Sequence, residues 1–409
     1  MKTAMMALLL VASSASAHIE AKESFTRKPI LADLSDLRAL NIPVLAKEEA
    51  VGVGYAVVTP ELQQQLQARA HQVGKCGGFE DLSQEANFHA FNFTSMLNDL
   101  ASIKAKNDGY HTAPYRLAEV TKNPEIEAAI NEVSEDNLKA TVQWLSSYPN
   151  RYNRSNTPNV HVDDMKKRLE EMLATSKLPY EVSVIPHKST PQNSLRVRLI
   201  GSTRPNEIVV LGGHLDSINA GWGSGKAAPG ADDNASGSSN LVEILRIVSQ
   251  KAQPQRTIEF FWYAGEESGL LGSAEIAKQY KAEKKDVVAV LQLDMTLYPG
   301  SGEFVVGSMT DFTSSWLRDY FKAMNEMYIH GRIIDDECGY GCSDHASWYR
   351  QGYPTLMPFE SKMHYDNPNI HTAKDLINSD SNFRHSAMYS KIGLVFAMDL
   401  ANSEARQPY

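Results

Sequence analysis

Two patterns of hydrophobic and polar positions divide the chain. Between residues 123 and 175, apolar residues recur every three or four positions, which predicts helices at 123–146 and 160–175. From residue 195 onward, short apolar runs alternate with helical patterns. We expect strands at 195–200, 208–211, 258–263, 287–293 and 355–359, and helices at 240–250, 270–280, 311–328 and 384–401. Such alternation is typical of a largely parallel sheet covered by helices on both faces.

The first 118 residues have a different pattern. One positive charge precedes an apolar run at 4–12, and small residues follow up to Ala17, which predicts a secretory signal at 1–17. A buried N-terminal helix is the alternative. Residues 18–118 contain helix-compatible stretches at 61–72 and 87–106 but no convincing group of metal ligands. We interpret 18–118 as a small pro-domain or accessory domain, and 119–409 as the main domain.

Composition excludes several classes of protein. A chain of 409 residues with 42% hydrophobic and 22% charged residues is ordinary globular material, not collagen-like, disulfide-dense or disordered. The formal net charge of −9 lacks the basic excess of a nucleic-acid-binding protein. The sequence contains no run of eighteen apolar residues, so no membrane span is predicted.

The cysteines carry information about the compartment. Two of the three, Cys338 and Cys342, are four residues apart with glycines between them, and in an oxidising compartment this spacing favours a local disulfide. A metal-thiolate pair is the rival interpretation. The third, Cys76, is expected to be free or lost on processing.

Acidic and histidine side chains follow the expected strands at one edge of the sheet. They are His214 and Asp216, Asp232 and Asp233, Glu266 and Glu267, and Asp294. Separately, Asp232 and Asp233 could cap a helix, Glu266 and Glu267 could start a solvated helix, Asp294 could belong to a strand-end turn, and His214 could be a satisfied polar residue. These explanations do not account for their coincidence at the edge where open α/β sheets bind ligands. Buried carboxylates need a partner or a metal, and carboxylates combined with imidazole suit zinc above all.

The chain also shows a family resemblance. From about residue 120 it resembles the secreted dizinc aminopeptidases of the M28 metallopeptidase family, most of all the bacterial leucyl aminopeptidase branch. The matching strings, in the family's order, are GGHLDS at 212–217, PGADDNASG at 229–237, EESGL at 266–270, LQLDMT at 291–296, CGYGCSDHASW at 338–348 and NIHT at 369–372. The resemblance implies an α/β three-layer sandwich with a mostly parallel, mixed central sheet flanked by helices, as in zinc peptidases.

The resemblance also implies a ligand set for two Zn²⁺ ions. Asp233 should bridge the ions. His214 and Asp294 should complete one site, and Glu267 and His371 should complete the other.

Three further roles are implied for catalysis. Glu266 should be the general base, and Tyr340 should donate a hydrogen bond to the developing oxyanion. Asp216 should orient the imidazole of His214 through its other ring nitrogen. A disulfide between Cys338 and Cys342 fits the family as well.

A substrate pocket is implied next to these residues, although core packing would equally explain its apolar members. Its expected lining is Met295, Met357, Phe359, Met363, Asp366 and Ile370. Met363 and Asp366 stand where leucine-preferring relatives would carry aromatic rings. We therefore hypothesise that the pocket accepts lysine or arginine as well as apolar side chains.

The resulting expectation is a secreted enzyme, extracellular or periplasmic, that removes N-terminal residues from peptides and proteins. It should act as a monomer after an inhibitory propeptide is removed, although a permanent accessory domain remains an alternative for residues 18–118. A single-zinc glutaminyl cyclase and a non-catalytic binding protein of the same fold are the rival functions. Metal stoichiometry and turnover separate the three.

Overall fold

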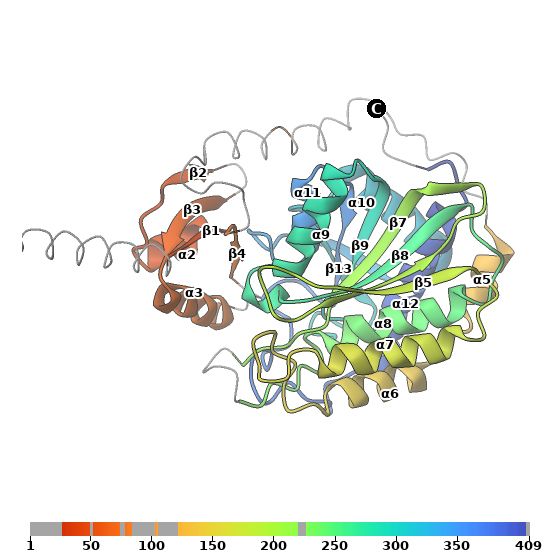
Figure 1. Ribbon diagram of the computed structural model, residues 1–409, viewed down its shortest axis with the longest axis horizontal. Coiled ribbons are helices and arrows are strands. Elements are labelled where there is room, and N and C mark those ends of the chain that lie inside the picture. The colour runs from red at the N-terminus through yellow and green to blue at the C-terminus, as the bar shows by residue number, and fades with distance from the viewer. Residues whose placement is uncertain are drawn as a thin grey trace, which may run out of the picture.

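The computed structural model describes residues 27–49, 52–73, 78–83, 102, 104, 122–219 and 226–405 (Figure 1). The predicted signal segment, Cys76, the predicted boundary at 118/119 and most of the predicted helix at 87–106 lie outside the described residues.

A six-stranded sheet forms the centre of the larger part of the molecule. The strand order is β12-β9-β7-β8-β6-β5. Its members are β5 (Tyr180–Ile185), β6 (Ser194–Leu199), β7 (Arg204–His214), β8 (Arg256–Tyr263), β9 (Asp286–Gln292) and β12 (Thr355–Leu356). The four strands from β12 to β8 are parallel, whereas β6 and β5 are antiparallel to their neighbours. The predicted mixed, mostly parallel sheet is therefore confirmed.

Helices cover both faces of this sheet (Figure 1). On one face lie α5 (Pro124–Ile130), α6 (Glu135–Leu145), α7 (Val160–Leu173), α8 (Ala235–Val248), α10 (Ser315–Met324) and α12 (Phe383–Leu400). On the other face lie α9 (Leu271–Ala282) and α11 (His345–Arg350). The architecture is the expected three-layer sandwich.

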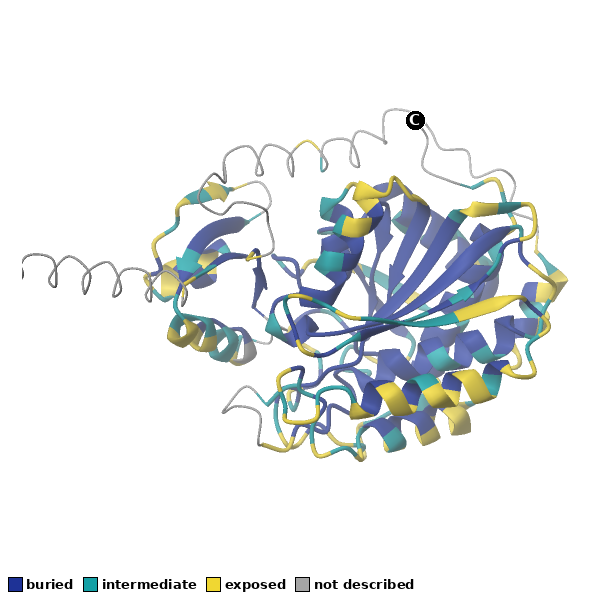
Figure 2. Cartoon of the chain, viewed as in Figure 1, coloured by how far each residue is buried: buried dark blue, intermediate teal, exposed yellow. Residues whose placement is uncertain are grey.

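The alternation of side chains along the central strands explains the two layers of core. Val209 and Leu211 of β7 join the core under α8 and α12, whereas Ile208 and Val210 join the core under α9. Successive residues of a strand point to opposite faces, so a strand covered on both faces is apolar throughout. All eight residues of β8 are buried, as the dark strands of Figure 2 illustrate.

Three expected elements differ from the structure. The predicted helix at 123–146 is two helices, because Ser134 accepts a hydrogen bond from the backbone of Asn137 and starts α6 anew. The predicted helix at 311–328 begins only at Ser315 and ends in a π-helix at Asn325–Ile329. The strand predicted at 355–359 is split between β12 and β13 (Pro358–Phe359), which belong to different sheets.

Strand β13 belongs to a small second sheet of order β11-β10-β13. Its other strands, β10 (Val305–Met309) and β11 (Arg332–Asp336), are not evident from the hydrophobic pattern. This sheet lies next to the loops that carry several of the predicted site residues.

The N-terminal part has its own antiparallel sheet of order β2-β3-β1-β4. Its elements are β1 (Lys28–Asp33), α2 (Leu34–Ala39), β2 (Ala46–Glu48), β3 (Val53–Val58), α3 (Pro60–Gln72) and β4 (Phe79–Asp81). Helix α3 confirms the helix expected at 61–72. The four strands are short and are not evident from the hydrophobic pattern.

The N-terminal part packs directly on the larger part. Leu31, Val53, Tyr55 and Leu82 share one apolar core with Leu270, Phe312, Ala346 and Tyr349. Glu80 of β4 forms an ion pair with Arg350 of α11, and both side chains are more than nine-tenths buried. A buried apolar contact with a buried ion pair at its side holds the two parts together.

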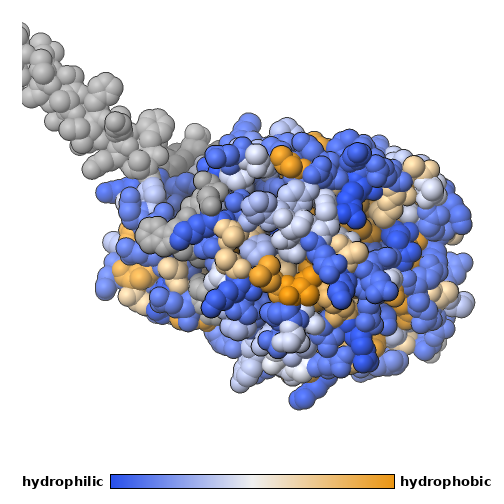
Figure 3. All heavy atoms as spheres, turned by 90° about the horizontal axis from the view of Figure 1, so that it is seen from below, coloured by the Kyte–Doolittle hydropathy of each residue, from blue (hydrophilic) through white to orange (hydrophobic). Residues whose placement is uncertain are grey.

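Within the described residues, no helix is long and apolar enough to cross a membrane. Figure 3 shows one face of the molecule, on which hydrophilic residues predominate and apolar residues gather in small patches.

Candidate active site

The edge of the central sheet positions most of the predicted site residues. Strand β7 ends at His214, and Asp294 stands two residues beyond the end of β9. Glu266 and Glu267 form a 3₁₀ turn (Glu266–Ser268) shortly after β8. Asp233 precedes α8, and His371 comes from the loop between β13 and α12. All of these side chains are buried, with at most 5% of their surface exposed.

Five of these side chains form two groups that share one member. In the first group, His214 Nε2 lies 3.1 Å from Asp233 Oδ1 and 3.2 Å from Asp294 Oδ1. In the second group, His371 Nε2 lies 2.9 Å from Asp233 Oδ2 and 3.0 Å from Glu267 Oε2. Asp233 therefore directs one carboxylate oxygen to each group.

The spacing of these atoms fits metal ligation. Nitrogen and oxygen ligands lie about 2.0–2.2 Å from a tetrahedral Zn²⁺, which places neighbouring ligand atoms about 3.3 Å apart. The observed separations of 2.9 to 3.2 Å are close to that value. Oε1 of Glu267 is buried and accepts no hydrogen bond from the described residues. Oε2 of Glu267 and Oδ2 of Asp233 both face the same ring nitrogen of His371. Buried carboxylate oxygens need such a partner, and a cation would supply it.

The pKa shifts of the side chains in these two groups also indicate that a cation is needed. Burial of Glu267, together with the charge of Asp233, raises the pKa of Glu267 to about 7. Burial lowers the pKa of His371, but the charges of Glu267 and Asp233 raise it by more. The resulting pKa of His371 is well above its usual value. Without a metal, protons on imidazole compensate the crowded carboxylates. Because metal ligation requires neutral imidazole, a bound cation would displace those protons.

Glu266 belongs to neither group, although it adjoins Glu267. Burial raises the pKa of the Glu266 carboxyl well above its usual range, although His214 opposes the shift. Its backbone N–H donates to Asp216 Oδ1 at 3.1 Å. The same Asp216 oxygen lies 3.5 Å from Nδ1 of His214, whose nearest partner is the backbone oxygen of Asp216 at 3.1 Å. Asp216 thus connects the imidazole of His214 to the turn that carries Glu266.

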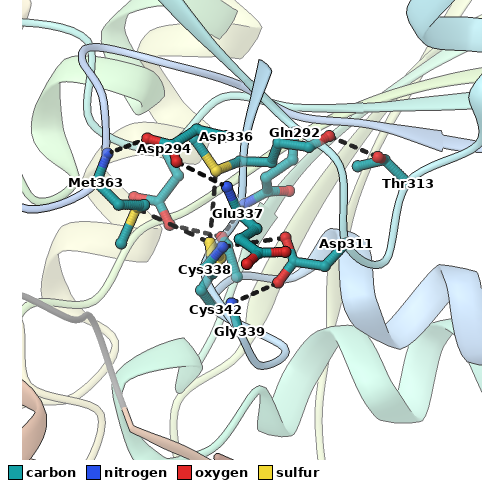
Figure 4. The surroundings of a disulfide bond; sticks show 12 residues. Gln292, Asp294, Asp311, Thr313, Asp336, Glu337, Cys338, Gly339, Cys342 and Met363 are labelled. Carbon is teal, nitrogen blue, oxygen red and sulfur yellow. Dashed lines mark hydrogen bonds between the residues drawn. A yellow bond between two sulfur atoms is a disulfide. The ribbon is translucent and has the colours of Figure 1, made fainter. Parts of the chain in front are cut away.

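The loop that carries Tyr340 is fixed at both ends. Cys338 and Cys342 form the disulfide that the sequence favours. The carboxylate of Asp311 accepts hydrogen bonds from the backbone N–H groups of Cys338 at 3.1 Å and Gly339 at 2.7 Å (Figure 4). Directly after the disulfide, Ser343 Oγ donates to Asp294 Oδ2 at 2.5 Å. The loop is therefore attached to a predicted metal ligand.

The apolar residues predicted for the pocket come together. Met295, Met357, Phe359, Met363 and Ile370 form one buried cluster with Met309, Tyr340 and the disulfide. Asp366, the polar residue predicted for the pocket, is not a member of this apolar cluster. It lies in the loop three residues after Met363. Burial raises the pKa of Asp366 to about 6.

Two further features of the site are not evident from the sequence. The guanidinium of Arg151 is buried and donates to four backbone carbonyls, those of Leu145, Leu215, Pro229 and Gly230. Two buried carboxylates, Glu360 and Asp375, contact backbone N–H groups of the ligand loops. Neither Arg151 nor Glu360 stands in a distinctive sequence pattern. The acidic residue four positions after His371 is the one signal that could have pointed to Asp375.

Comparison with known proteins agrees with this geometry. The model of peptidase family M28 matches residues 195–392. The "Probable leucine aminopeptidase" of Arthroderma otae is 37% identical over 287 residues, which is 69% of this chain and 78% of that protein. "Leucine aminopeptidase 1" of Aspergillus fumigatus is 34% identical over 323 residues, 75% of this chain and 82% of that protein.

A similar solved structure is the LapA aminopeptidase of Legionella pneumophila. It superimposes with a TM-score of 0.77 at 27% identity and covers 92% of this chain and 99% of its own. The superposition therefore extends into the N-terminal part.

The chain belongs to peptidase family M28. As the sequence predicts, it is a metal-dependent hydrolase of the aminopeptidase class.

Proposed function

We propose that the chain is a secreted zinc aminopeptidase with two zinc ions, which hydrolyses the N-terminal peptide bond of peptides and proteins. The observation that carries this proposal is the position of Asp233, whose two oxygens face two different ligand groups. A buried carboxylate between two imidazoles and two further carboxylates suits a pair of zinc ions. His214 and Asp294 would hold one ion, and Glu267 and His371 would hold the other.

When bound, the zinc ions would supply Lewis-acid activation of water and polarisation of the scissile carbonyl. The chain itself would move the proton. Glu266 accepts a proton from the attacking water and transfers it to the leaving amine, a role that its raised pKa and its place outside both ligand groups support. Asp216 keeps the imidazole of His214 in orientation through Nδ1. Tyr340 donates a hydrogen bond to the oxyanion.

The apolar cluster around Tyr340 would receive the side chain of the N-terminal residue. Its methionines and Phe359 favour an apolar residue there. Asp366, in the loop between Met363 and Ile370, would add affinity for lysine or arginine. The preference is thus for apolar and also basic N-terminal residues.

The N-terminal part would act as a propeptide that masks the site until it is removed. Two contacts support this role. Gln67 of α3 donates to the backbone oxygen of Glu267 at 2.9 Å. His364, next to the pocket, has its Nδ1 2.8 Å from the carbonyl oxygen of Val73. The signal at residues 1–17 would direct the chain to the periplasm or the medium, where the processed enzyme would act as a monomer. Full activity of the unprocessed form on small substrates would contradict the masking role.

The experiment is hydrolysis of leucyl, lysyl and phenylalanyl anilides by the processed protein, with and without a zinc chelator. We expect chelator-sensitive release, restored by added zinc, and two zinc ions per chain by elemental analysis. One zinc ion per chain without anilide release would favour a glutaminyl cyclase. Zinc-loaded, folded protein without turnover of either kind would favour a binding protein.

A further inference from the structure

A carboxylate behind the metal ligands holds the backbone of the bridging residue. Asp375 has 1% of its surface exposed. Its Oδ1 accepts a hydrogen bond from the backbone N–H of Asp232 at 3.0 Å, and its Oδ2 accepts one from the backbone N–H of Asp233 at 3.0 Å. One carboxylate thus binds two consecutive peptide groups, the second of which belongs to the residue shared by both ligand groups.

The same segment ties this backbone to the loop of His371. The backbone oxygen of Asp375 accepts from the N–H of Ala231 at 3.1 Å. Nδ2 of Asn367 lies 3.1 Å from Asp232 Oδ2 and 3.4 Å from Asp375 Oδ1. Asp375 is four residues after His371, so it connects two segments that each contribute a ligand to the second group.

The arrangement has a consequence for the bridge. Asp233 serves both groups only if its carboxylate plane keeps one orientation, because Oδ1 faces His214 and Oδ2 faces His371. A rotation of the peptide groups at 232 and 233 would swing both oxygens at once. A carboxylate has acceptors on both oxygens, whereas an amide of the same shape presents a donor on one side. Only the acid therefore satisfies both N–H groups in this geometry.

We propose that Asp375 is a positioning residue for the bridging carboxylate of Asp233 and thereby sets the affinity of the protein for zinc. The inference rests on the proposed function, because it needs the metal centre to exist. It concerns neither the proton transfer nor the substrate pocket. Partners of this kind behind metal ligands typically account for about 10- to 100-fold in metal affinity.

The test is zinc affinity of the folded protein, measured by competition with a chromogenic chelator. In Asp375→Asn the side-chain amide meets the N–H of Asp232 or Asp233, donor against donor. We expect zinc to bind about 10- to 100-fold more weakly than in the wild type. At saturating zinc, kcat for an anilide should recover while KM stays unchanged. Asp380→Asn is the matched control, because Asp380 is exposed in the following turn, and it should bind zinc like the wild type.

The outcomes separate the possible failures. Wild-type protein that binds no zinc would contradict the proposed function itself. Wild-type and Asp375→Asn proteins with equal zinc affinity would overturn the positioning role, even if the variant unfolds at a lower temperature without zinc. If Asp375→Asn does not fold, Asn367→Ala takes its place, since Asn367 donates to both Asp232 and Asp375. Its zinc affinity should fall several-fold, and a wild-type value would overturn the inference.

Discussion

Two adjacent glutamates provide a sharp test of the site, because the structure gives them different surroundings. Glu267 Oε2 lies 3.0 Å from His371 Nε2 within a ligand group. Glu266 belongs to neither group, and its turn is held through the backbone N–H that donates to Asp216. Replacing each glutamate by glutamine keeps shape and removes charge. The pair Glu266→Gln and Glu267→Gln therefore separates proton transfer from metal binding.

For Glu266→Gln we expect both zinc ions to remain and kcat to fall. A positioned general base contributes about 10²- to 10⁴-fold, which corresponds to about 3 to 5 kcal/mol of transition-state stabilisation. The substitution should not destabilise the fold, because burial disfavours the charge of this carboxyl and raises its pKa well above the usual range. KM should change little, since the loss concerns the transition state.

For Glu267→Gln we expect the zinc content to fall from two ions per chain towards one. The measurements are elemental analysis after dialysis, thermal unfolding, and steady-state hydrolysis of a leucyl anilide. A kcat of Glu266→Gln within tenfold of the wild type would refute its role as the base. Two tightly bound zinc ions in Glu267→Gln would refute its assignment as a ligand.

Three further results are expected. Glu80→Ala leaves Arg350 buried without its ion-pair partner, so unfolding of the unprocessed chain should become easier by about 3–5 kcal/mol, whereas an unchanged denaturant midpoint would contradict the pairing. Burial lowers the pKa of His161 to about 3 in the folded protein. Between pH 6.5 and 3, His161 therefore binds a proton in the unfolded chain but not in the folded chain, and the free energy of unfolding falls as the pH drops through that window. The loss of unfolding free energy from pH 7.5 to 5 should therefore be smaller by about 2 kcal/mol in His161→Leu, and an equal loss in both proteins would count against a neutral buried imidazole. Asp366→Asn should lower kcat/KM for lysyl anilides severalfold and leave leucyl anilides unchanged, so a uniform effect on both would remove the case for an acidic pocket.

Some features of the site were determined by local pattern. His214 ends an apolar strand, and Glu266, Glu267 and Asp294 closely follow one. Parallel strands deliver such residues to one edge of the sheet. The disulfide between Cys338 and Cys342 joins residues near in sequence, so their spacing was sufficient to favour it. The alternation of β6 to β9 with their helices was predictable for the same reason, because periodicity is a local property, whereas β5, β10 and β11 were not predicted.

Other features depend on contacts between segments far apart in the chain. Ser134 divides the helix predicted at 123–146, and its backbone N–H donates to Glu243 of α8, more than a hundred residues away. The strand expected at 355–359 is divided between two sheets because different neighbours pair with its two halves. No pattern within residues 355–359 contains that information, whereas the cap at Ser134 is a local signal within 123–146.

The sequence by itself determined the class of the fold and the carboxylate and imidazole groups that gather at one edge of the sheet, since these follow from periodicity and residue chemistry. Only the tertiary structure decided how these side chains are held. Arg151 and Asp375 form their hydrogen bonds with residues up to 143 positions away. Folding brings those groups within bonding distance, and no spacing along the chain encodes it. The sharing of Asp233 between two groups depends on the same long-range contacts, because its backbone is held by a segment from the other end of the domain.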